Sequence, residues 1–128
     1  MRRTTIVAAL LLAGGCSPSC DETVIARSDA PDGRRGAVVL RRDCGATTGS
    51  STRVAILSPG DLPSDAGTVF SADDDHGAAA PGDGGGPWAE ARWLTADHLL
   101  VSHAARSRVF RQSGEAAGVR ISYRAVDR

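Results

Sequence analysis

Residues 36–60 read GAVVLRRDCGATTGSSTRVAILSPG, and this stretch decides the fold class. Residues 36–42 carry a short apolar run of the kind that forms buried strands. In residues 52–57, Val54 and Ile56 alternate with smaller or polar residues, and a period of two is typical of a strand. Glycines and small hydroxyl residues, which favour turns, separate the two runs. The stretch therefore predicts two strands joined by a loop.

Strand-like segments recur along the rest of the chain, with turn-forming residues between them. They cover residues 23–27, 36–42, 52–57, 68–72, 88–94, 99–101, 108–112 and 119–123. No convincing 3.6-residue apolar period indicates a helix in this part of the chain. We therefore predict an all-β domain over residues 23–128, with about seven short strands in a single antiparallel sheet or curled meander.

The apolar residues on one side of these strands define a candidate core. They are Val24, Val38, Leu40, Val54, Ile56, Val69, Trp93, Leu99, Val101, Val109, Ile121 and Tyr123. The chain has only five aromatic residues, so we expect a small core that benefits from a covalent staple.

The N-terminal residues have the layout of a secretory signal peptide. Two arginines precede an apolar run over residues 6–13, and small residues follow. A membrane-spanning helix needs roughly 20 apolar residues, so a permanent transmembrane anchor is not expected. Ala13-Gly14-Gly15-Cys16 resembles the lipobox of bacterial lipoproteins, although Ala13 replaces the usual leucine. The resemblance implies a leader over residues 1–15, a diacylated Cys16 and a tether over residues 16–22.

Two acyl chains on Cys16 would give firm attachment to membrane lipid, because one chain alone binds marginally. Ser17 is not the aspartate associated with retention in the inner membrane. The resemblance therefore favours the cell envelope, on the periplasmic face of the outer membrane where the host has one. Cleavage by ordinary signal peptidase near residues 13–15 is the alternative, and it would leave an exported protein without an anchor.

Charge excludes one class of partner. Without Arg2 and Arg3 the chain has 13 arginines, no lysine and 15 carboxylates, so the formal charge after the leader is about −2. Nucleic-acid-binding domains carry a basic footprint that this composition lacks. We expect no nucleic-acid partner and no cofactor.

The sequence predicts one modification for Cys16 and another for the other two cysteines. If Cys16 is lipidated, Cys20 and Cys44 remain, and an exported domain meets an oxidising compartment. We predict a Cys20–Cys44 disulfide, which closes a loop of about 25 residues and contributes roughly 3–4 kcal/mol in the chain-entropy treatment. The alternative makes Cys44 a nucleophile, with His76, His98 or His103 as its base.

Several motifs resemble a small family of exported bacterial proteins that has no assigned activity. The resemblance covers residues 29–57 and, more loosely, 68–110. It is carried by Pro31-Asp32-Gly33, Arg42-Asp43-Cys44-Gly45-Ala46-Thr47-Thr48-Gly49, Ser51-Thr52, Val69-Phe70-Ser71-Ala72-Asp73 with His76-Gly77, Gly85-Gly86-Pro87, and Trp93. Ser50 and Ala30 depart from the family pattern. The resemblance implies export and a shared fold, but no chemistry.

The loop within the first motif is a candidate ligand site. Its residues are Asp43, Gly45, Thr47, Thr48 and Gly49. A phosphate-binding P-loop requires a lysine, which this chain lacks. We interpret the loop as a structural turn in which glycines take positive φ and hydroxyl groups bond the backbone, with binding of a small polar or anionic ligand as the alternative.

An acidic run over residues 73–76 is the other candidate. Asp73, Asp75 and His76 are weak candidates for a metal site, since carboxylates suit hard cations and histidine suits transition metals. The spacing does not fit a calcium-binding EF-hand, and a solvated loop that bonds its own backbone is the simpler interpretation. His98 and His103 are five residues apart, so they should point to opposite faces of a strand.

Together these features predict a non-enzymatic lipoprotein domain of the cell envelope with a structural or binding role. They leave open whether its partner is a protein or a small ligand. The alternative is a metal-dependent or thiol-dependent envelope enzyme that uses Asp73, Asp75 and His76, or Cys44.

Overall fold

The computed structural model describes residues 20–45 and 49–128. Nine strands run in the order β1 (Asp21–Asp29), β2 (Gly36–Asp43), β3 (Ser51–Leu57), β4 (Gly67–Asp73), β5 (Ala89–Thr95), β6 (His98–Ala104), β7 (Arg108–Gln112), β8 (Glu115–Ala116) and β9 (Val119–Val126). A 3₁₀ turn, η1 (Pro63–Asp65), precedes β4. The all-β prediction is confirmed, and each predicted segment corresponds to one strand.

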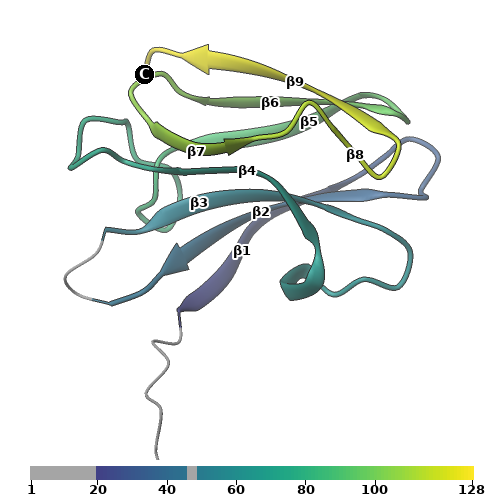
Figure 1. Ribbon diagram of the computed structural model, residues 1–128, viewed down its shortest axis with the longest axis horizontal. Helices are drawn as coiled ribbons and strands as arrows, with labels where there is room; N and C mark the ends of the chain where they lie inside the picture. Colours follow the sequence, from purple (N-terminus) through teal and green to yellow (C-terminus); the bar gives the residue numbers. More distant parts are fainter. Residues whose placement is uncertain (1–19, 46–48) are drawn as a thin grey trace, which may run out of the picture.

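The strands form two stacked sheets rather than the single curled sheet expected from the sequence (Figure 1). One sheet has five antiparallel strands in the order β1-β2-β3-β4-β7, and the other has the order β5-β6-β9-β8. The chain leaves the second sheet after β6, adds β7 beside β4, and returns so that β9 lies parallel to β6. This crossover depends on long-range pairing, which strand periodicity does not specify.

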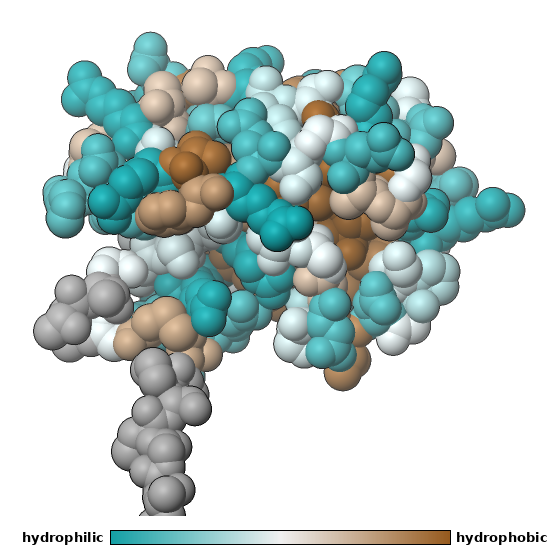
Figure 2. All heavy atoms as spheres, viewed as in Figure 1, coloured by the Kyte–Doolittle hydropathy of each residue, from teal (hydrophilic) through white to brown (hydrophobic). Residues whose placement is uncertain are grey.

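The main core lies between the two sheets, where hydrophobic residues show between the layers in Figure 2. Its buried members are Ala37, Val39, Val54, Ile56, Val69, Phe70, Ala72, Leu99, Val101, Val119 and Ile121, and Trp93, Val109 and Tyr123 pack against it. Most of the predicted core residues therefore contribute to this layer.

Three predicted core residues lie elsewhere. Val38 and Leu40 belong to a second apolar cluster with Ala55, Leu57 and Ala66. Both clusters draw on neighbouring residues of β2, which explains its continuous apolar run. Val24 is 47% exposed, so its assignment to the core is wrong. It lies opposite Leu40 on an edge strand, where a register shift follows it.

The first strand starts earlier than the sequence predicted. Asp21 and Glu22, which were expected in the tether, begin β1, because Asp21 pairs with Asp43 and Glu22 bonds Arg53 at 2.9 Å. The leader and the lipidation residue Cys16 lie outside the described residues. Within residues 20–45 and 49–128, no helix has the length and apolar character needed to cross a membrane.

A nearly buried arginine holds the segment before β4, which contains Ala66, over the second apolar cluster. The Arg53 side chain is 11% exposed and lies on β3. Its guanidinium donates to Thr68 Oγ1 at 2.7 Å and to the carbonyl of Ala66 at 3.2 Å, besides its bond to Glu22. Arg53 therefore joins β1, β4 and the segment that contains η1.

Candidate functional site

Several of the sequence motifs lie at one end of the sandwich, where Figure 1 also places the start of β1 and the C-terminus. The Pro31-Asp32-Gly33 motif lies at the opposite end of β1, in the turn that leads to β2. Pairing brings the segments of the first end together: Asp21 with Asp43, Asp73 with both Ser51 and Arg108, and Ala104 with Val126. We call this the disulfide end, and it comprises Cys20 and residues 43–45, 49–51, 73–88, 105–107 and 127–128.

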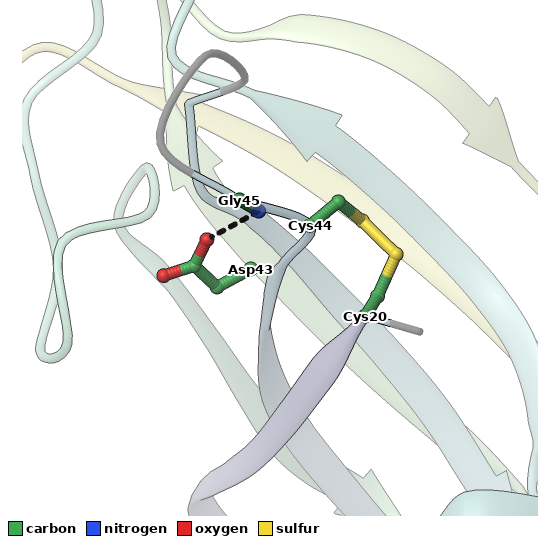
Figure 3. Close-up of a disulfide and its surroundings, with 4 residues drawn as sticks. All are labelled: Cys20, Asp43, Cys44 and Gly45. Atoms are coloured by element: carbon green, nitrogen blue, oxygen red, sulfur yellow. Dashed lines mark hydrogen bonds between the residues drawn. A yellow bond between two sulfur atoms is a disulfide. The ribbon is translucent and has the colours of Figure 1, made fainter. Parts of the chain in front are cut away.

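The disulfide lies at the start of β1 (Figure 3). Cys20 and Cys44 are bonded at an S–S distance of 2.04 Å, next to the last ladder pair, Asp21 and Asp43. The predicted disulfide is thus present. Because the sulfur of Cys44 is bonded, it offers no thiol for the nucleophile of the alternative hypothesis.

The motif loop begins as a structural turn. Asp43 Oδ1 accepts a hydrogen bond from the backbone N–H of Gly45 at 3.1 Å (Figure 3), and Gly45 has a φ of +126°. Gly49 does not take positive φ; a Cβ there would lie 3.5 Å from Asp74 Oδ1, so this loop adjoins the acidic run. Thr47 and Thr48 lie outside the described residues.

Asp73 of the acidic run bonds to an arginine. Arg108 Nε lies 3.1 and 3.2 Å from the two carboxylate oxygens of Asp73, and Arg108 Nη2 makes a further short contact. These bonds lower the pKa of the Asp73 carboxyl below its usual value, against a smaller opposing effect of burial. Asp73 Oδ1 also accepts from the N–H of Asp75 at 3.0 Å, so the acid bonds its own loop, as the simpler interpretation predicted.

The weak metal candidates are not assembled into a site. Asp75 and His76 follow with φ values of +49° and +57°, which shape a tight turn. In the described part of the chain, no three histidine, cysteine or carboxylate side chains gather as metal ligands. Asp73, Asp75 and His76 therefore do not form a ligand set in this structure.

The glycine-rich loop that precedes β5 packs closely against β2 and β3. Thr52 Oγ1 donates to the carbonyl of Pro87 at 2.7 Å. A Cβ added to Gly86 would lie only 2.6 Å from Thr52 Oγ1. Arg41 similarly donates to the carbonyl of Gly84, where a Cβ would lie 2.9 Å from Arg41 Cδ. The Ser51-Thr52 and Gly85-Gly86-Pro87 motifs therefore contact each other, and this contact holds the loop against the sheet.

The hydrogen bond from Thr52 to Pro87 places the next residue, Trp88, beside a cavity of about 510 Å³, which we call the Trp88 groove. Its lining includes Ile25, Val39, Thr52, Asp83, Trp88, Ala89, Glu90 and Arg128. The backbone of Trp88 is bonded on both sides, to Ala80 at 2.8 Å and to Ala104 at 2.9 Å. The volume falls within the range typical of small-molecule sites, and the lining mixes apolar side chains with carboxylates and one guanidinium.

A cation already lies on the Trp88 ring. The guanidinium carbon of Arg128 is 4.2 Å from the ring centroid, within the distance of a cation–π interaction. The sequence did not identify this site, because Trp88 and Arg128 are 40 residues apart and neither belongs to a known ligand motif. An aromatic residue directly after Gly-Gly-Pro is the one local signal that could have drawn attention to it.

The two strand histidines point to opposite faces, as predicted. His98 Nε2 lies 2.7 Å from Ser122 Oγ, and Arg120 donates to His98 Nδ1 at 3.1 Å. His103 is buried on the core face, with its ring centroid 5.0 Å from that of Phe70. The two histidines therefore do not share a site.

The chain matches no protein-family model, no curated protein and no solved structure. Its class is therefore defined by its own fold and geometry: a disulfide-bonded domain of two stacked β-sheets, with a groove at its disulfide end. The resemblance to a family of exported bacterial proteins stays a prediction.

Proposed function

We propose that the protein is a non-enzymatic lipoprotein domain of the bacterial cell envelope, with a binding role at its disulfide end. The observation that carries the proposal is the position of Cys20, stapled at the start of β1 and only four residues after Cys16. Four residues extend at most about 14 Å. A lipid on Cys16 would therefore hold the disulfide end close to the membrane surface.

The bonding of the candidate catalytic groups favours a binding role over an enzymatic one. Cys44 is bonded to Cys20, and Asp73 receives two hydrogen bonds from the Nε of Arg108. In contrast, the Trp88 groove is preformed and combines an aromatic face with carboxylates. The outer membrane remains the proposed location in a host with two membranes, after removal of residues 1–15.

Fractionation of the cell envelope tests the proposal. The full chain and a Cys16→Ser variant are expressed in a bacterium with two membranes, and both are traced through membrane and periplasmic fractions. We expect the unaltered protein in the outer-membrane fraction and the variant outside it. A Cys20→Ser/Cys44→Ser variant is the control, because it should remain in the membrane while it loses stability.

Equal fractionation of the unaltered chain and the Cys16→Ser variant would overturn the anchor. The enzymatic alternative has its own test on protein purified without chelator. Stoichiometric bound metal, or a free thiol at Cys44, would favour that alternative over a binding role.

A further inference from the structure

We propose that the Trp88 groove is a binding site for a cationic group, of the guanidinium or quaternary ammonium type, held on the face of the Trp88 indole. The inference rests on the proposed binding role and gives it a ligand class. It does not depend on how the protein is anchored.

The chain itself shows which chemistry the indole face accepts. Arg128 places its guanidinium 4.2 Å from the centroid of the Trp88 ring, although it could extend into solvent as an exposed residue. The negative face of an indole attracts cations within about 6 Å, and tryptophan is the strongest of the aromatic partners. A ligand cation of similar size would occupy the same position.

The charges around the groove favour a cation as well. Two exposed carboxylates, Asp83 and Glu90, line the groove, and Arg128 is its only basic residue. Neither carboxylate takes part in the ion pairs found among the described residues. If a ligand displaced Arg128, the groove would keep two negative charges beside an aromatic face, the combination that recognises ammonium groups.

The site is also rigid before any ligand arrives. Backbone bonds to Ala80 and Ala104 hold Trp88 on both sides, and the bond from Thr52 to Pro87 fixes the residue before it. A preformed site loses little conformational entropy on binding. The only part that must move is the Arg128 side chain, which therefore acts as an internal competitor for the ligand.

Fluorescence titration of the full chain, purified from the envelope in a non-ionic detergent, tests the inference. A Trp93→Phe background leaves Trp88 as the only tryptophan, and choline and arginine methyl ester are the probes. We expect saturable quenching by both. The uncharged isostere of choline, with carbon in place of nitrogen, should give none.

Variants then separate the roles of the groove residues. Arg128→Ala should bind choline about two- to five-fold more tightly, because an exposed cation–π contact contributes roughly 0.5–1 kcal/mol. Asp83→Asn/Glu90→Gln should weaken binding. Arg34→Ala, at an exposed arginine in the turn between β1 and β2, is the matched control and should leave affinity unchanged. To test the indole itself, Trp88→Leu is compared with its parent by calorimetry, and binding should be lost.

The inference is overturned if folded Arg128→Ala protein does not bind either probe, or if Trp88→Leu binds them as well as its parent does. Circular dichroism establishes that each variant is folded. Binding without lipid on Cys16 would overturn the proposed anchor but leave this site standing. Lipid on Cys16 without binding of either probe would overturn this site but leave the proposed anchor standing.

Discussion

The hydroxyl oxygen of Tyr123, on β9, lies 3.0 Å from the carbonyl oxygen of Val69, on β4, so this side chain joins the two sheets. The same hydroxyl is 2.6 Å from the carbonyl of Ser113, which follows β7. Burial raises the pKa of Tyr123 to about 12, and the hydrogen bond to Ser113 and the charge of Arg111 reduce this effect only partly. The neutral phenol is therefore the form that the folded state holds.

Stability should fall at high pH because of this phenol. In the unfolded chain Tyr123 ionises near pH 10, whereas the folded state keeps its proton until about pH 12. The stabilisation is complete below pH 10 and is lost as the pH rises toward 12. The chain has no lysine and only one tyrosine, so little else titrates in this window. Denaturant unfolding at pH 8 to 12 should show the decline.

A Tyr123→Phe variant provides the control for that measurement. It should be about 1–2 kcal/mol less stable than the unaltered protein at neutral pH, because two carbonyls lose a hydrogen-bond donor. It should also lack most of the decline above pH 10. A parallel decline in both proteins would show that Tyr123 is not its source.

Removal of the disulfide should cost about 3–4 kcal/mol of the free energy of unfolding. The Cys20–Cys44 bond spans a sequence separation of 24 residues and fixes the edge strand β1 against β2. Chemical denaturation of Cys20→Ser/Cys44→Ser beside the unaltered protein measures the difference. Equal midpoints would contradict a structural role for the bond.

Gly86 lies so close to Thr52 that the addition of one methyl group should destabilise the fold. Gly86→Ala should lower stability by about 1–3 kcal/mol, because its Cβ would meet Thr52 Oγ1 at 2.6 Å. Gly114→Ala is the matched control, since nothing lies within 4 Å of the added carbon and its φ is not positive. The thermal midpoints of the two variants should differ clearly. A similar midpoint for both would contradict the close packing of Gly86 against Thr52.

Arg53 should be more important for stability than its partner. Arg53→Met removes the donors to Ala66, Thr68 and Glu22 together, and we expect a loss of roughly 2–3 kcal/mol. Glu22→Gln keeps those donors and should cost less than about 1 kcal/mol. Urea unfolding measures both. Equal effects would mean that the charge pair, and not the link to the covering segment, determines the stability.

Asp73 should contribute to stability only while it is ionised. Its pKa is lowered, chiefly by the hydrogen bonds from Arg108, so this contribution is present above the unfolded pKa near 3.8 and is lost as the pH falls below it. Asp73→Asn should be less stable at neutral pH and should show a weaker dependence on acid. Asp74→Asn, a charge-matched change in the same run, should behave like the unaltered protein.

Local patterns were enough to predict the strands but not their arrangement. The alternation around Val54 and the apolar run through Val39 depend only on near neighbours, so the sequence identified both strands. The pairing of β7 with β4, and the parallel placement of β9 beside β6, depend on contacts distant in sequence. Val24 shows the same limit, because periodicity cannot distinguish an edge strand from a central one.

The candidate site was predictable to the extent that its parts are local. Turn chemistry identified Asp43 and Gly45, and the export context identified the cysteine pair. The Trp88 groove was not predictable, because it depends on Thr52, 36 residues before Trp88, and on Arg128, 40 residues after it. Only the folded chain brings these residues together.

The mass of the intact protein, extracted from the cell envelope without reducing agent, tests both the lipid anchor on Cys16 and the Cys20–Cys44 disulfide. We expect a chain of residues 16–128 that carries a diacylglycerol group on Cys16 and lacks the two hydrogens removed by the Cys20–Cys44 bond. A species that retains the leader, lacks lipid, or shows both cysteines reduced would contradict this prediction.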